Sequence, residues 1–218
     1  MLVFDKNCSK TLSYRIPLLI LVFYIAAIHA KSQQPPALAI TAFPYVESFE
    51  YVYGQWEQDE TDDFDWTVNV SVTPYDGTGP VSAYDGECYI FTRASEHYPF
   101  KRANIISPRM DISRLQEPVL SFAYNMYGEH IGHLQVWVSV DDGKSWNELI
   151  CAYNGNKGER WYVAHFDIQR YSGQSIRFKF EGTTGDGVLG DLAIDYVFIG
   201  EGSDFSFRDE QKDMAWQE

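Results

Sequence analysis

Apolar and polar residues alternate with a period of two over much of the chain. In residues 120–127, Leu, Phe, Tyr and Met alternate with smaller or more polar side chains, and residues 134–140 and 176–181 repeat this pattern. Since successive side chains of a β-strand point to opposite faces, the alternation predicts strands that are buried on one face. Other strand-like runs, the last of them more apolar, cover residues 66–72, 88–93, 161–167 and 192–199.

Turns rich in glycine, aspartate and asparagine separate these runs. They read YDGTGP, YDGE, YGEHIG, DDGKS, NGNKG and TTGDG, and such residues favour tight turns between strands. In DDGKS we expect Asp141 or Asp142 to bind turn amides and Gly143 to adopt a positive φ. No segment shows sustained helical periodicity. The pattern therefore predicts an all-β fold, a jelly-roll β-sandwich of two antiparallel sheets.

The N-terminus has the pattern of a secretory signal peptide. Basic residues precede the apolar run 16–27, and Ala30 offers a small residue at a cleavage position. Residues 16–30 would span only about 22 Å as a helix, less than a hydrocarbon core of about 30 Å, which favours export over membrane spanning. We expect a signal peptide (1–30), a linker (31–42), the β-sandwich domain (43–200) and a polar tail (201–218), with no transmembrane span beyond the N-terminal signal.

The charge of the chain excludes some partners. Removal of residues 1–30 takes away three basic residues and one acidic residue, so the net charge changes from −14 to −16. An acidic surface of this kind opposes binding to nucleic acid and to anionic lipid, and it suits a protein that meets divalent cations. We expect a secreted or cell-surface protein that does not bind nucleic acid.

Two cysteines and one sequon follow the signal segment. Cys88 and Cys151 lie in strand-like stretches, and either one disulfide or two buried free thiols fits the sequence, because spacing alone does not show whether they meet. Asn69 begins the sequence NVS, an N-glycosylation site if the source is a eukaryote.

The sequence contains no recognisable catalytic set. The HxxH pair of His130 and His133 has no third ligand at the spacing of a zinc site, and no nucleophile elbow, Cys/His pair or phosphate-binding loop is visible. We therefore expect a protein that is not an enzyme.

The segment DETDDFDW (59–66) places five acidic residues beside Phe64 and Trp66. Two carboxylates about 4 Å apart repel each other by roughly 1 kcal/mol even in water, so the segment must either bind a cation or stay solvated. In the simpler interpretation, Asp63 and Asp65 cap the turn while the two aromatic side chains fill the core.

An ordered series of short motifs runs through residues 43–200. It comprises FE (49–50), GQW (54–56), DDFDW (62–66), TPxxGTGP (73–80), ISP (106–108), LSFAYNMYG (120–128), GNKGxxW (155–161), FEG (180–182) and GDLAID (190–195). The series resembles the MAM domain, the extracellular module of meprins, neuropilins and receptor tyrosine phosphatases of the mu type. The resemblance implies a jelly-roll β-sandwich that serves cell adhesion through a protein partner or self-association, without catalysis.

The resemblance also implies a structural Ca²⁺ site, near the junction of the first strand, the acidic segment and the last strand. Calcium takes about six to eight oxygen ligands from carboxylates and carbonyls. By position in the motifs, the candidate metal ligands are Glu50, Asp62, Asp63, Asp65, Asp191 and Asp195.

The chain departs from the MAM pattern at several positions. Glu47, Gly54 and Val119 stand where many animal members have cysteines, and Tyr196 replaces an aspartate. The usual disulfides of the family are therefore missing, and one potential ion ligand is lost.

A calcium-stabilised carbohydrate-binding module is the alternative function. Jelly-roll modules also bind sugars through exposed aromatic side chains. Trp137 and Tyr127 lie on the polar sides of their strands and could form such a platform for a glycan.

Overall fold

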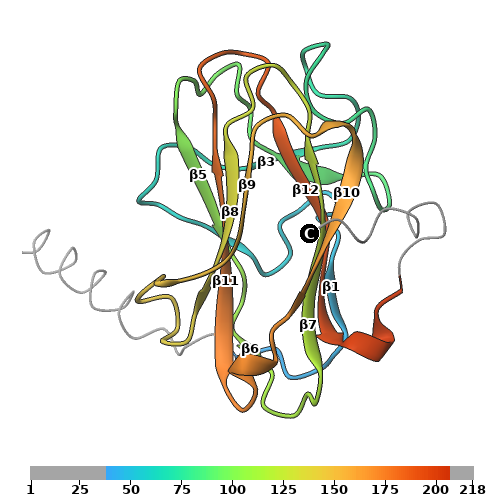
Figure 1. Ribbon diagram of the computed structural model, residues 1–218, viewed down its shortest axis with the longest axis vertical. Helices are drawn as coiled ribbons and strands as arrows, with labels where there is room; N and C mark the ends of the chain where they lie inside the picture. The colour runs from blue at the N-terminus through green and yellow to red at the C-terminus, as the bar shows by residue number, and fades with distance from the viewer. Residues whose placement is uncertain (1–37, 207–218) are drawn as a thin grey trace, which may run out of the picture. The chain divides into compact units, whose positions relative to one another are not determined.

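The computed structural model describes residues 38–206, which form two six-stranded antiparallel sheets that pack face to face (Figure 1). The first sheet has the order β10 (Gly158–Asp167), β7 (Pro118–Met126), β12 (Leu192–Glu201), β4 (Tyr89–Phe91) and β3 (Thr67–Asn69), and β1 (Tyr45–Glu47) pairs with β12. The second has the order β2 (Glu57–Gln58), β5 (Arg102–Ile106), β11 (Ser175–Thr183), β8 (His133–Ser139) and β9 (Glu148–Asn154), and β6 (Met110–Asp111) pairs with β11.

The predicted all-β sandwich is confirmed. Every predicted strand run contains a strand, and within residues 38–206 the only helical elements are two short 3-10 turns, η1 (Gln169–Tyr171) and η2 (Gly202–Asp204). In this range no helix is long and apolar enough to cross a membrane. The predicted signal peptide lies outside the described residues.

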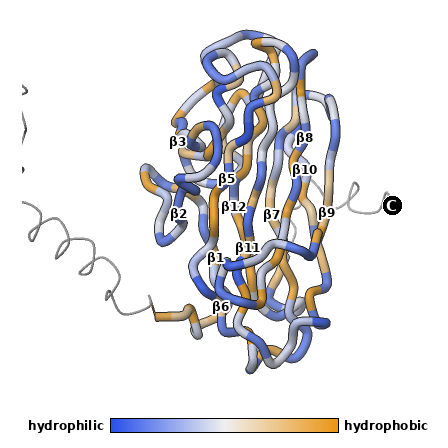
Figure 2. The backbone as a smooth tube through the Cα atoms, turned by 90° about the vertical axis from the view of Figure 1, so that its left-hand side faces the viewer, coloured by the Kyte–Doolittle hydropathy of each residue, from blue (hydrophilic) through white to orange (hydrophobic). Residues whose placement is uncertain are grey.

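Aromatic side chains join the two sheets. Phe122 of β7 meets Phe180 of β11 edge to face at 4.9 Å between ring centroids, and Trp56 meets the same ring at 5.4 Å. Edge-to-face pairs of this kind contribute about 0.5–1.5 kcal/mol beyond the burial of their area. Figure 2 shows that hydrophobic and hydrophilic residues both occur along the strands. In β8 buried residues alternate with partly exposed ones, so one face of this strand points into the interior.

Strand β7 is buried on both faces, and the prediction of a half-buried strand was wrong for it. Its outward side chain Ala123 belongs to a second apolar cluster on the outer face of the first sheet, together with Tyr89 and Trp161. The indole N–H of Trp161 donates to the backbone oxygen of Ser82 at 2.9 Å, which holds the segment 80–87 over this face. A loop therefore covers the strand where the sequence pattern predicts solvent.

The turn after β8 forms as predicted. Asp141 accepts hydrogen bonds from the backbone N–H and the hydroxyl of Ser145, and Gly143 has a φ of 82°. Val140, expected to be buried, is exposed because β8 ends at the preceding residue.

The fold extends beyond the predicted domain limits of 43–200 at both ends. Ile40 exchanges backbone hydrogen bonds with Arg109 and Asp111 beside β6. At the other end, the ring of Phe205 packs against Phe198 at 5.1 Å between centroids. The sandwich thus includes residues that were assigned to the linker and to the tail.

Candidate functional site

The six predicted calcium ligands lie at three places in the structure. Within residues 38–206, no group of three or more His, Cys, Asp or Glu side chains is arranged to hold a metal ion. The structure therefore does not bring the six carboxylates together, and the calcium site stays a prediction.

The acidic segment 59–66 lies along the part of β5 that the short strand β2 does not cover. Asp62 accepts a hydrogen bond from the backbone N–H of Asn104, and Asp63 accepts one from that of Arg102 at 3.0 Å and another from the Lys101 ammonium at 3.2 Å. Strand β2 pairs with only the last two residues of β5. Since backbone groups that have no neighbouring strand need other partners, these carboxylates complete the pairing that a longer β2 would provide.

The carboxylates of this segment differ in their electrostatic environment. Burial raises the pKa of Asp62 to about 6, although the Asn104 N–H opposes the shift. The Arg102 N–H and the Lys101 ammonium hold the pKa of Asp63 below its usual value. The side chain of Asp65 is exposed.

The two aromatic residues of the segment enter the interior. Phe64 stacks on the imidazole of His97 at 4.2 Å between centroids, and Trp66 is fully buried with its indole N–H donating to the Ala103 oxygen at 3.1 Å. A Cβ atom at Gly182 of β11 would come within 2.9 Å of the Trp66 ring, so this position needs a glycine. The prediction that these aromatics fill the core is confirmed.

Glu50 and Asp195 lie together at the second of the three places. There they hold the segment 84–88 against the first sheet. Asp195 is fully buried, and burial together with the nearby charge of Glu50 raises the pKa of Asp195 to about 8 against the opposing backbone N–H groups. Asp195 accepts hydrogen bonds from the N–H groups of Tyr84, Asp85 and Tyr196 at 2.7–2.9 Å, and Glu50 accepts them from Glu87 and Cys88 at 3.1 and 3.2 Å.

The sequence YDGE predicts only a turn at residues 84–87 and does not indicate this contact with two carboxylates. The glycine in this turn, Gly86, is the one sequence signal of the contact. It has a φ of 63°, and a Cβ atom added at this position would lie 2.1 Å from a carboxylate oxygen of Glu50. A glycine at such a position indicates close approach of the backbone to a side chain, here the Glu50 carboxylate.

The raised pKa of Asp195 predicts a pH-dependent stability. The folded protein keeps a proton on Asp195 that the unfolded chain, with the ordinary value of 3.8, releases. In chelator, the free energy of unfolding is therefore expected to fall as the pH rises from 7 to 8, with a slope of up to about 1.4 kcal/mol per pH unit. Asp62 and Asp191 act in the same direction only up to about pH 6. His165, whose pKa is lowered by burial, acts in the opposite direction, and only below about pH 6.5.

Urea unfolding at pH 7.0 and 8.0 measures this slope. In the Glu50→Gln variant the fall should move to lower pH, because the neighbouring negative charge is gone. A wild-type free energy that is constant or rises between these two pH values would contradict the assignment to Asp195.

Asp191 occupies the third place. One of its carboxylate oxygens accepts a hydrogen bond from the Ala94 N–H at 2.9 Å, while the other is buried and has no hydrogen-bond partner among residues 38–206. The nearby hydroxyl of Thr73 donates to the Thr78 oxygen instead. Burial raises the pKa of Asp191 to about 6, opposed by the Ala94 N–H and by the charge of Arg93.

Cys88 and Cys151 are free thiols in the structure, so the disulfide that the sequence left open is not formed. Cys88 directly precedes β4 in the first sheet, and Cys151 lies in β9 of the second. Their positions in opposite sheets keep them apart.

Asn69 uses its side-chain amide within the fold. The amide nitrogen donates to the backbone oxygens of Ser71 and Val72 at 2.7 and 3.1 Å and to the Tyr89 hydroxyl at 2.6 Å. A glycan attached to this nitrogen would leave it only one N–H for these three acceptors, and glycosylation stays a prediction.

Trp137 and Tyr127 do not share a surface. Trp137 is half-buried on the outer face of the second sheet, where the Lys179 ammonium lies 5.9 Å from its ring and 5.4 Å from that of Trp146. Lys179 is also paired with Glu181 at 3.3 Å. Tyr127 follows β7 in the first sheet. The common aromatic platform expected for a glycan is therefore absent from this pair.

The comparison with protein families gives the decisive observation. The family model for the MAM domain (meprin/A5/mu) matches residues 48–203. The chain belongs to the MAM family. In this MAM domain the match includes the acidic segment, the segment 84–88 and strand β12, and so it spans all three places at which the candidate carboxylates lie.

Relatives of this MAM domain are found in surface proteins. MAM domain-containing glycosylphosphatidylinositol anchor protein 2 of Mus musculus is 36% identical over 163 residues, covering 66% of this chain and 17% of that protein. Neuropilin-1 of Xenopus laevis is 29% identical over 145 residues, covering 66% of this chain and 15% of that protein. The chain thus spans about a sixth of the length of these curated relatives.

A solved structure supports the same fold. The K3 cleaved adhesin domain of Lys-gingipain from Porphyromonas gingivalis W83 has a TM-score of 0.54 at 14% identity, covering 74% of this chain and 99% of that one. Together, the family and its relatives identify this MAM domain as an extracellular interaction module, secreted or at the cell surface, as the sequence predicted.

Proposed function

We propose that this MAM domain is a non-catalytic adhesion module that binds a protein partner or a second copy of itself. One observation carries the proposal: the segment 70–81 exposes several large apolar side chains on a loop that is tied to the sandwich. Exposed apolar surface of this kind is typical of protein-interaction sites. The side chains and their exposed fractions are Val70 59%, Val72 55%, Tyr75 48% and Val81 75%.

The distribution of the carboxylates supports the same proposal. Asp62, Asp63 and Asp195 accept hydrogen bonds from backbone N–H groups and so hold loops in place. Carboxylates used in this way fix the shape of a binding surface, and shape complementarity at an interface depends on such fixed loops.

Binding by beads coated with the purified domain tests this proposal. Replacing both Val72 and Val81 by serine is expected to weaken the binding of the domain to a second copy or to cell-surface proteins by about tenfold or more. A tenfold loss corresponds to roughly 1.4 kcal/mol of apolar contact. Val140→Ser is the matched control, because Val140 is also exposed, at 48%, but lies in the β8–β9 turn. Equal binding by both variants would refute the role of the segment 70–81.

We further propose a structural Ca²⁺ ion at Glu50 and Asp195. Their carboxylates lie close enough for the charge of Glu50 to act on Asp195, and a cation between them would keep both ionised. Because calcium needs about six to eight oxygens, carbonyl oxygens of the segment 84–88 and water would complete its coordination. The ion would steady this segment on the outer face of the first sheet.

A further inference from the structure

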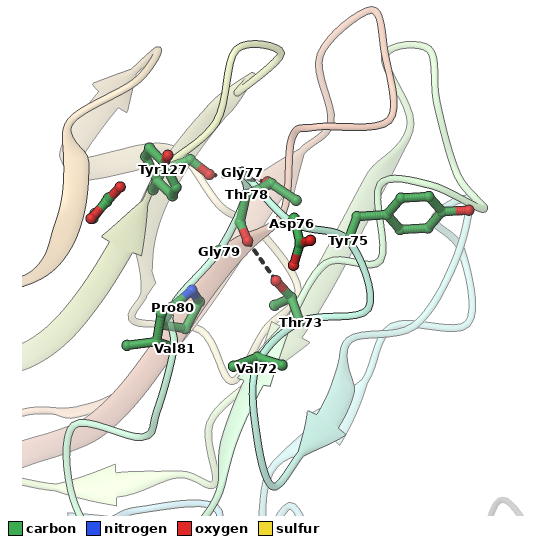
Figure 3. A pocket seen from close by; sticks show the side chains of 11 residues that line it. Val72, Thr73, Tyr75, Asp76, Gly77, Thr78, Gly79, Pro80, Val81 and Tyr127 are labelled. Atoms are coloured by element: carbon green, nitrogen blue, oxygen red, sulfur yellow. Dashed lines mark hydrogen bonds between the residues drawn. The ribbon is translucent and has the colours of Figure 1, made fainter.

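A small pocket lies where the segment 72–81 meets Tyr127 and Glu159 (Figure 3). Its volume is about 170 Å³. Pockets for drug-sized ligands and cofactors have volumes of about 300–1,000 Å³, so this pocket is too small for an oligosaccharide or a nucleotide. Its size suits a single protruding side chain.

The walls of the pocket are held by hydrogen bonds. The Gly79 N–H and the Thr78 hydroxyl both donate to the backbone oxygen of Tyr127, at 2.8 and 3.0 Å. The Thr73 hydroxyl donates to the backbone oxygen of Thr78. Gly79 has a φ of 66°, and a Cβ there would lie 2.5 Å from the Thr73 methyl, so the loop closes only with glycine. A ligand would therefore meet a preformed site and would not have to order it.

The lining of the pocket is acidic and aromatic. Asp76 and Glu159 both line it, and neither forms an ion pair within residues 38–206. A hydrogen bond between the Tyr127 hydroxyl and Glu159 raises the pKa of Tyr127. Behind the wall, the backbone N–H of Asp191 donates to the Thr78 hydroxyl at 2.8 Å. Figure 3 shows the carboxylate of Asp76 beside Thr73, while the Tyr75 side chain points away.

We propose that this pocket receives an arginine side chain of a protein partner, an inference that rests on the proposed adhesion function. A guanidinium group is planar, so it can stack on the Tyr127 ring while it donates hydrogen bonds to the carboxylates of Asp76 and Glu159. A lysine ammonium fits this combination less well, because it is a compact and strongly hydrated point charge. The exposed Val72 and Val81, which also line the pocket, would contact the surface around the arginine.

An NMR titration of the ¹⁵N-labelled domain with N-acetyl-arginine amide tests the inference. The amide signals of Gly77, Thr78 and Tyr127 are expected to shift saturably. The neutral analogue N-acetyl-citrulline amide, of nearly the same shape, should cause no saturable shift, and N-acetyl-lysine amide should bind more weakly than the arginine probe.

Charge-removing variants locate the binding. Replacing both Asp76 by Asn and Glu159 by Gln is expected to weaken the affinity for the arginine probe by about tenfold or more. The matched control replaces Asp186 by Asn and Glu60 by Gln, because these two residues are also exposed and acidic but do not line the pocket. The control variant should bind like the wild type.

Equal shifts with the citrulline or lysine probe, or unchanged affinity in the Asp76/Glu159 variant, would overturn the inference. The titration contains no protein partner, so its failure is distinct from failure of the proposed function. If the domain binds its partner on beads but the pocket does not respond to arginine, only the pocket assignment falls.

Discussion

Replacing Trp66 by alanine is expected to lower the free energy of unfolding by about 3–5 kcal/mol, the usual cost of deleting a buried tryptophan. The Trp66 ring is fully buried against Gly182, and its N–H donates to the Ala103 oxygen on β5. The substitution leaves a cavity between the acidic segment and the second sheet, and it leaves the Ala103 oxygen without this donor.

Urea unfolding of the variant measures this loss, and Trp146→Ala provides the control. Trp146 is only half-buried on the outer face of the second sheet beside Lys179. Its removal should therefore cost clearly less than that of Trp66. Equal losses in the two variants would mean that Trp66 does not anchor the acidic segment.

Calcium is expected to raise the melting temperature of the domain relative to chelator. At calcium concentrations of roughly 100 times the dissociation constant, binding to the folded state alone stabilises it by about 2.7 kcal/mol. Glu50→Gln or Asp195→Asn should remove most of this gain, since these two carboxylates would hold the ion. Differential scanning calorimetry in calcium and in chelator measures the effect.

A variant in the acidic segment 59–66 provides the control for the calcium experiment. Asp65→Asn also removes one exposed carboxylate of a predicted ligand, but the segment 59–66 lies along β5 and away from the residues that Asp195 contacts. This variant should keep the full calcium gain. Identical melting with and without chelator in the wild type would reject the site altogether.

The period-two pattern predicted strands well where one face meets the core and the other meets solvent. Strand β8 is an example, with Leu134, Val136 and Val138 inside. Strands β5 and β9 were missed because they are short or only partly buried and show no clear alternation. The outer face of β7 is covered by a cluster that includes Trp161, and Trp161 binds Ser82, 79 residues away. Local periodicity does not report such contacts.

The candidate site was predictable only in part, for a related reason. Acidic residues repel one another, so the crowding in segment 59–66 predicted either a cation or solvation, whereas the structure gives Asp62 and Asp63 backbone N–H groups as partners. Asp195 and Tyr84 are separated by 111 positions, and an N–H donor carries no side-chain signature. The sequence therefore identified residues with special partners, such as Asp195 and Trp66, without identifying the partners.

The most direct test of the adhesion proposal is saturable binding of the purified domain to intact cells, measured after two separate treatments. Trypsin removes protein from the cell surface, and glycosidases remove glycans. If the domain recognises protein, binding is lost after trypsin, persists after glycosidases and is unchanged by Trp137→Ala. Binding that survives trypsin but disappears with the glycans or with Trp137→Ala would contradict the account and favour a carbohydrate-binding module.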